Sequence, residues 1–88
     1  MNSKQKKILR TILDGSGMVS REDFASLLRA LGFITHQGSG SRQRLLSEKY
    51  GALSLHWPHG GESTVPKGMM KRIRESFIEK GIHHELDL

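Results

Sequence analysis

Residues 33–57 read FITHQGSGSRQRLLSEKYGALSLHW, and this stretch decides the predicted fold. It holds three segments of strand-forming residues, separated by two short turns rich in glycine and polar residues. The last segment alternates most clearly, because Leu53, Leu55 and Trp57 face one way and the residues between them face the other. Short turns favour antiparallel pairing, so the stretch predicts a three-stranded antiparallel sheet. The predicted strands are residues 33–37, 42–47 and 52–57.

Amphipathic helices flank this sheet in the sequence. Apolar residues recur at helical spacing in three segments. Ser20 and Asp23 resemble a capping box before the second helix, and Pro66 is placed to open the last one. Three strands need a cover on one face to be stable, and the second and last helices can provide it. The predicted fold is α+β, in the order α-α-β-β-β-α, with His56 on the outward sheet face.

Length and composition limit the possible functions. The chain has 88 residues, a formal net charge of +5 and no cysteine. This length makes one domain, and the lack of cysteine excludes a disulfide scaffold, a thiolate metal site and a cysteine nucleophile. No run of 18 apolar residues is present, so no membrane span is expected. We expect a small, basic, cytoplasmic protein with an anionic partner, no metal and no cofactor.

The positive charge is concentrated near the two ends of the chain. Clustered cations raise the local potential and release counterions when they meet phosphates, which favours a nucleic-acid partner. The alternative is that both clusters are solvated helix faces. The first cluster is Lys4, Lys6, Lys7 and Arg10, and the second is Lys67, Lys71, Arg72 and Arg74. Residues 75–88 are acidic in balance.

Several segments, taken in order, resemble the HicA-type toxins, the small toxin halves of bacterial toxin–antitoxin pairs. The matching segments are residues 24–33 (FASLLRALGF), 38–42 (GSGSR), 56–60 (HWPHG) and 67–74 (KGMMKRIR), followed by Gly81 and Ile82. The resemblance implies a fold like the double-stranded-RNA-binding domain and cleavage of mRNA without a metal (an mRNA interferase). It also implies a HicB-like antitoxin as protein partner. It divides the chain into a basic N-terminal helix and turn (1–18), a core domain (19–82) and an acidic tail (83–88).

One position departs from the family. Members commonly carry a histidine held to be catalytic after the Gly-Ser turn, and this chain has Arg42 there. Arginine stays protonated in proteins, so it cannot serve as a general base. Either the catalytic role has moved, or the chain is a non-catalytic module that binds double-stranded RNA or DNA. A third possibility is an adaptor whose basic face meets an acidic protein.

Histidine and arginine supply the candidate site. Cleavage of RNA by its own 2′-OH needs a base, an acid and a cation near the phosphorus, and histidine suits the two proton-transfer roles. We hypothesise that His56 or His59 transfers protons while Arg42 binds the scissile phosphate. The alternative places His56 on the strand surface and His59 in a loop, without a catalytic role. The predicted phosphate-binding residues are Ser41, Arg42, Arg44, Lys67, Lys71, Arg72 and Arg74.

The remaining candidates have simple structural alternatives. Lys67 and Lys71 stand at the start of the last helix, where free N–H groups and the helix dipole favour an anion, with Arg74 on the same line. A solubilising helix face explains them too, and a plain hairpin explains the turn that contains Ser41. His36 has no evident acid–base companion in the sequence and is set aside. His83 and His84 are assigned to a solvated tail, and Trp57 to the core rather than to base stacking.

Overall fold

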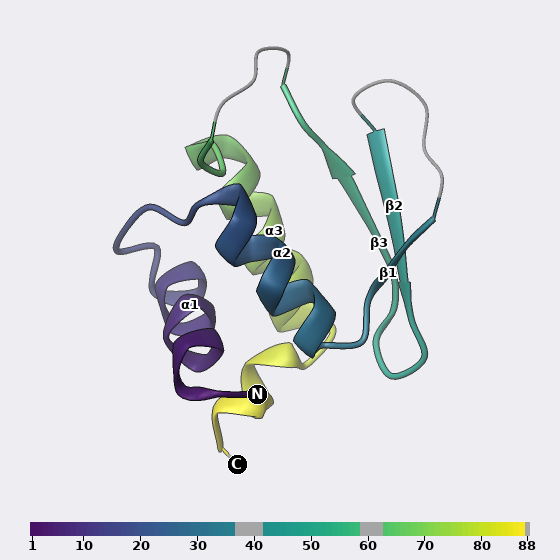
Figure 1. The fold of residues 1–88 in the computed structure, drawn as a ribbon, viewed down its shortest axis with the longest axis horizontal. Helices are drawn as coiled ribbons and strands as arrows, with labels where there is room; N and C mark the ends of the chain where they lie inside the picture. Colours follow the sequence, from purple (N-terminus) through teal and green to yellow (C-terminus); the bar gives the residue numbers. More distant parts are fainter. Residues whose placement is uncertain (37–41, 59–62, 88) are drawn as a thin grey trace.

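The computed structural model describes residues 1–36, 42–58 and 63–87, and its fold is shown in Figure 1. The elements along the chain are α1 (Ser3–Asp14), α2 (Arg21–Ala30), β1 (Ile34–His36), β2 (Arg42–Ser47), β3 (Gly51–His56), α3 (Lys67–Glu79) and the 3-10 helix η1 (Ile82–Asp87). The predicted α+β class and the order α-α-β-β-β-α are confirmed, and η1 follows α3 as an additional short element.

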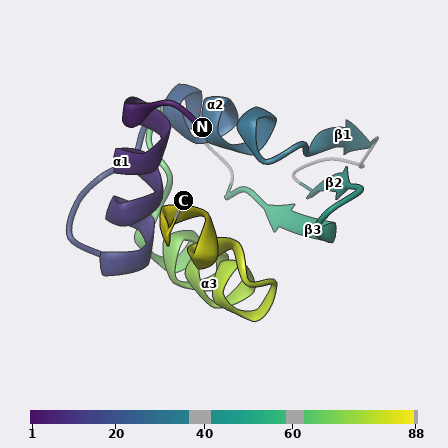
Figure 2. The ribbon, with the colours of Figure 1, turned by 90° about the horizontal axis from the view of Figure 1, so that it is seen from below.

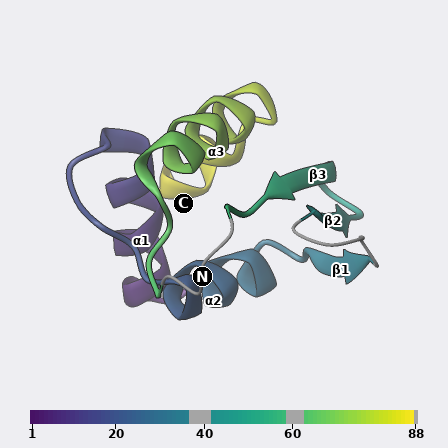
Figure 3. The same cartoon turned by 90° about the horizontal axis from the view of Figure 1, so that it is seen from above.

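The three strands form one antiparallel sheet with β2 in the centre. Seen from below and from above, α2 and α3 lie on one side of the sheet, and α1 lies on the far side of these two helices (Figures 2 and 3). η1 packs against α1 and α3. No described helix covers the opposite side of the sheet.

A single hydrophobic cluster joins these layers. Leu9 and Ile12 of α1 and Ile82 of η1 have no exposed surface, and all three belong to the same cluster as the side chains of α2, α3 and the sheet. The N-terminal helix and the C-terminal segment are therefore parts of the same folded unit as residues 19–82. The acidic segment expected to be a solvated tail is ordered as far as Asp87, because Ile82 anchors it and Leu86 packs against the cluster.

The helix ends are stabilised by the residues that suit them. Asn2 and Gln5 form a reciprocal capping box at the start of α1, with distances of 2.8 and 3.0 Å. The Ser20 hydroxyl accepts a 3.0 Å hydrogen bond from the backbone N–H of Asp23, which confirms Ser20 as the cap of α2. Gly15 ends α1 with φ of 66°, a left-handed conformation that glycine adopts without strain.

Trp57 is half-buried and packs against the hydrophobic cluster, in line with its spacing from Leu53 and Leu55. Its indole N–H donates a 3.1 Å hydrogen bond to Gln43 Oε1. Its ring meets Phe24 edge-on at 6.3 Å, and the Arg21 guanidinium lies 3.9 Å from the ring centroid. These contacts hold the indole beside α2 at the end of β3.

Candidate nucleic-acid interface on the open sheet face

The register of the sheet places the candidate residues on a common surface. Arg42 lies directly opposite His56, and Arg44 lies between His36 on one side and Ser54 on the other. Directly opposed residues of antiparallel strands point to the same face of a sheet. We call this surface, which points away from α2 and α3, the open face. Its side chains are Ile34, His36, Arg42, Arg44, Leu46, Ala52, Ser54 and His56, all exposed.

The predicted proximity of Arg42 and His56 is thus observed. Sequence alternation placed His56 outward and gave Arg42 and Arg44 a common face, but it left open whether that face was the same one. The pairing of Arg42 with His56 settles this point, because it brings both arginines to the side of the sheet that carries the imidazole. A guanidinium and an imidazole on neighbouring strands are close enough to contact one phosphate.

The sequence analysis did not include His36 in the candidate site, but the structure places it on the open face. It pairs with Arg44 at the end of β1, so its imidazole shares the open face with that of His56. The strand assignment alone could not show this. A register shift of one residue would have turned His36 to the other face. In the structure Ile34 is exposed, and its parity with His36 puts both residues on the same side of the sheet.

The open face is positively charged. None of the residues in the three strands is acidic, and the central strand contributes two guanidinium groups, Arg42 and Arg44. At the opposite end of this face Ile34 is 72% exposed and Leu46 is 37% exposed. The surface therefore combines an arginine–histidine region with a small apolar region.

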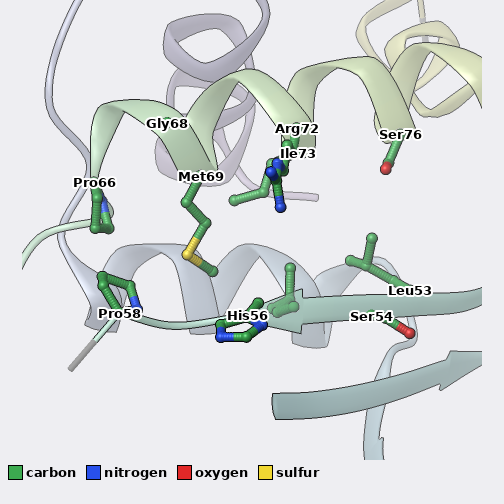
Figure 4. Close-up of a pocket in the computed structure, with 11 residues that line it drawn as sticks. Leu53, Ser54, His56, Pro58, Pro66, Gly68, Met69, Arg72, Ile73 and Ser76 are labelled. Atoms are coloured by element: carbon green, nitrogen blue, oxygen red, sulfur yellow. The ribbon is translucent and has the colours of Figure 1, made fainter. Parts of the chain in front are cut away.

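A groove runs between β3 and α3 beside His56. Its volume is about 570 Å³, and Figure 4 shows its two walls. Leu55 and Ile73 provide apolar lining, while His56 stands on the strand wall and Arg72 extends from the facing helix. Arg72 of α3 and His56 at the edge of the sheet therefore border the same groove.

The cations of α3 have different surroundings. The Arg74 Nε–H donates a 3.0 Å hydrogen bond to the carbonyl of Ile12, at the C-terminal end of α1. A side chain at Gly15 would collide with the Arg74 guanidinium, since an added Cβ would lie 2.5 Å from its Nη2. Arg74 therefore stabilises the end of α1, where a cation also interacts favourably with the helix dipole. Lys67 and Lys71 are exposed.

Two predicted site residues, Ser41 and His59, lie outside the described residues. Within the described ranges, no group of three or more histidine, cysteine, aspartate or glutamate residues is arranged to hold a metal ion. His83 and His84 lie in η1, remote from the sheet in the sequence, with their rings 4.1 Å apart and His84 Nδ1 3.4 Å from Asp87 Oδ2. They form no part of the open face.

None of the helices in the described part of the chain is long and apolar enough to cross a membrane. Comparison with protein-family models, with curated proteins and with solved structures finds no match for the chain.

Proposed function

We propose that this chain is a HicA-like RNA-binding toxin that cleaves mRNA without a metal ion, acts in the bacterial cytoplasm and is held inactive by a HicB-like antitoxin. The observation that carries the proposal is the cross-strand pair of Arg42 and His56 on the uncovered face of the sheet. HicA-type toxins commonly carry a histidine at the position of Arg42. In this chain, His56 on the neighbouring strand would take the place of that histidine.

The chemistry follows from the groups present. In RNA cleavage the 2′-oxygen attacks the adjacent phosphorus, and negative charge builds on the phosphoryl oxygens. Arg42 and Arg44 are placed to donate charge-assisted hydrogen bonds to those oxygens. His56 is placed to transfer a proton at one of the two reacting oxygens, since it lies beside Arg42 and is exposed. Arg72 stands across the groove and would contact a neighbouring phosphate.

The shape of the surface suits a nucleic-acid backbone. The open face carries no covering helix among the described residues, and its cations project from a rigid sheet rather than from a loop. Lys67 and Lys71 add charge at the start of α3. Recognition of RNA helices by proteins of this general build depends on backbone and shape more than on base edges.

Incubation of the purified protein with labelled RNA in the presence of EDTA tests the activity. We expect products that end in a 2′,3′-cyclic phosphate and begin with a 5′-hydroxyl. His56→Ala should lower the cleavage rate by about 10²- to 10⁴-fold, the usual contribution of a general acid or base. His84→Gln is the matched control, because His84 is an exposed histidine of η1. Equal cleavage by the wild type and His56→Ala would remove His56 from the site.

A second candidate function is favoured by Arg42 itself. A non-catalytic module for double-stranded RNA or DNA would keep the cationic surface and would not need an imidazole. It predicts salt-dependent binding, with log K falling linearly against log salt concentration, and intact RNA after prolonged incubation. Measuring binding and cleavage on the same RNA therefore distinguishes the two functions.

The proposed antitoxin would act by covering the open face. Exposed Ile34 and Leu46 offer it an apolar contact, and the neighbouring arginines favour an acidic partner surface. A complex reconstituted with the antitoxin encoded beside this chain should lose RNA binding, and Ile34→Lys should weaken the complex. RNA binding that persists in the saturated complex would place the antitoxin elsewhere.

A further inference from the structure

We propose that His36 is a second proton-transfer residue, which contacts the same phosphodiester as His56 from the opposite side of β2. The inference rests on the proposed function and adds a residue to its site. The observation behind it is the pairing of the two arginines of β2. Arg44 is paired with His36 on β1, and Arg42 is paired with His56 on β3.

The spacing of the two histidines fits one phosphate group. They lie on strands separated by two inter-strand intervals and are offset by two residues along the sheet. This arrangement puts their Cα atoms about 12 Å apart, from strand spacings of about 4.8 Å and a rise of about 3.4 Å per residue. Two imidazoles that reach inward leave room between them for a phosphate, directly above the two arginines.

The chemistry needs two proton-transfer groups on opposite sides of the phosphorus. As one imidazole removes the proton of the 2′-OH, the 2′-oxygen forms a bond to phosphorus. The bond from phosphorus to the 5′-oxygen breaks, and the other, protonated imidazole gives its proton to that oxygen. The products are a 2′,3′-cyclic phosphate and a 5′-hydroxyl. No electrons are transferred and no co-reactant is consumed, so His36, His56 and the two arginines suffice.

The surroundings of His36 support this role. The ionisable side chains that the three strands place on the open face are those of His36, Arg42, Arg44 and His56. None of the residues in the three strands is an aspartate or a glutamate. If His36 were only a surface residue of the edge strand β1, its role would not require an arginine opposite it or a second histidine on the same face.

The first experiment measures cleavage of RNA against pH for the wild type, His36→Gln, His56→Gln and the double variant. We expect a bell-shaped profile of kcat/KM for the wild type, and loss of one limb in each single variant. His36→Gln should lower the rate by about 10²- to 10⁴-fold with RNA affinity nearly unchanged. The double variant should be little slower than either single variant, because the two residues act as a unit. His84→Gln should match the wild type.

The second experiment needs no cleavage. A short 2′-O-methyl RNA oligonucleotide, which cannot react, is added while the imidazole signals are followed by NMR. We expect the signals of His36 and His56 to move together at the same oligonucleotide concentration, while that of His84 stays in place. Thr35→Ala, which changes an exposed neighbour in β1, should leave the response intact.

The two experiments separate the inference from the proposed function. If the wild type cleaves RNA and His36→Gln keeps both its rate and its pH profile, His36 is not a proton-transfer residue, while the toxin assignment stands. If the wild type cleaves nothing but both imidazole signals respond, the shared phosphate site is supported and catalysis is rejected. If the His36 signal does not respond to the oligonucleotide, the inference is wrong whatever the activity.

Discussion

Where β2 turns into β3, side chains and backbone groups from α2 and α3 hold the strands in place, whereas at the opposite end Arg42 and His56 are exposed on the open face. The Ser47 hydroxyl, buried at the turn, donates a 3.1 Å hydrogen bond to the carbonyl of Leu31 and accepts one of 3.3 Å from the N–H of Tyr50. Lys80 Nζ donates a 3.1 Å hydrogen bond to the carbonyl of Tyr50. The turn end fixes the strands, and the open end presents exposed polar side chains.

Aromatic and charged contacts strengthen the turn end further. Phe33 stacks on Tyr50 with ring centroids 6.3 Å apart, and Lys49 Nζ lies 3.6 Å from Glu85 Oε1 of η1. Both contacts connect the turn to segments outside the sheet. Because a slip of one residue would reverse every side chain, this end protects the shared orientation of Arg42, His56 and His36. Stability and function are therefore expected to respond to substitutions at different ends.

Among the substitutions that compare the two ends, Arg42→Gln at the open end is expected to have the largest effect. Loss of a charge-assisted hydrogen bond to phosphate should weaken RNA binding by about 10- to 100-fold. The free energy of unfolding should change by no more than about 0.5 kcal/mol, because the side chain is exposed. Binding is measured by fluorescence anisotropy and stability by urea denaturation. Arg29→Gln, in an exposed position of α2, is the control; an equal loss of binding in that variant would contradict a localised site.

An intermediate effect of the opposite kind is expected from Ser47→Ala, at the turn end. The substitution leaves the carbonyl of Leu31 without its hydroxyl partner, and an unsatisfied buried group costs about 1–3 kcal/mol. Urea denaturation should show a lower midpoint with an unchanged m-value, while RNA binding of the folded fraction stays near the wild-type level. Ser54→Ala removes an exposed serine from the adjacent strand and should leave stability intact. A stable Ser47→Ala variant would show that the turn is held by its other contacts.

The smallest effect concerns alkaline pH. Burial and a hydrogen bond to Glu85 raise the pKa of the Tyr50 hydroxyl above its ordinary value. The interaction of Lys49 with Tyr50, together with Glu85, raises the pKa of Lys49 as well. In both cases the folded state holds protons that the unfolded state releases, so stability falls as pH rises above about 10.

Tyr50→Phe tests how much Tyr50 contributes to this fall in stability at alkaline pH. Its stability should fall less steeply than that of the wild type between neutral pH and pH values above about 10, because Tyr50 is gone and Lys49 loses the main cause of its raised pKa. Thermal unfolding followed by circular dichroism over this range provides the measurement. Parallel curves for the two proteins would show that ionisation of Tyr50 does not contribute.

The sequence predicts the elements well because they depend on local periodicity. The apolar spacing of Phe24, Leu27 and Leu28 was enough to identify the buried face of α2, and the alternation of β3 was enough to orient His56. The role of Arg74 was not predicted, because it depends on a contact between distant segments. Arg74 reaches a carbonyl 62 positions earlier in the chain, and no local pattern records such a pairing.

Only part of the candidate site could be predicted, because its other part depends on contacts between strands. Parity along one strand put Arg42 and Arg44 on one face, but the partner of each arginine is decided by strand register. Register at His36 depends on the length of the β1–β2 connection, whose conformation the composition of the turn does not specify. Likewise, the acidic composition of residues 83–87 gave no sign of η1, which begins at the buried Ile82.

The hydrogen bond from Arg74 to the carbonyl of Ile12 means that different charge measurements on this protein should give different numbers of cations. An electrophoretic or ion-exchange assay registers every accessible cation, whereas a salt titration of RNA binding registers only those that displace counterions from phosphates. Some cations are already engaged within the fold: Lys4 with Asp23, Arg21 with Trp57, Lys49 with Glu85, Arg74 with Ile12 and Lys80 with Tyr50. The number of ions released on binding should therefore fall well below the 14 lysines and arginines of the chain. Net charge alone therefore overstates the number of cations that this protein has available for an anionic partner.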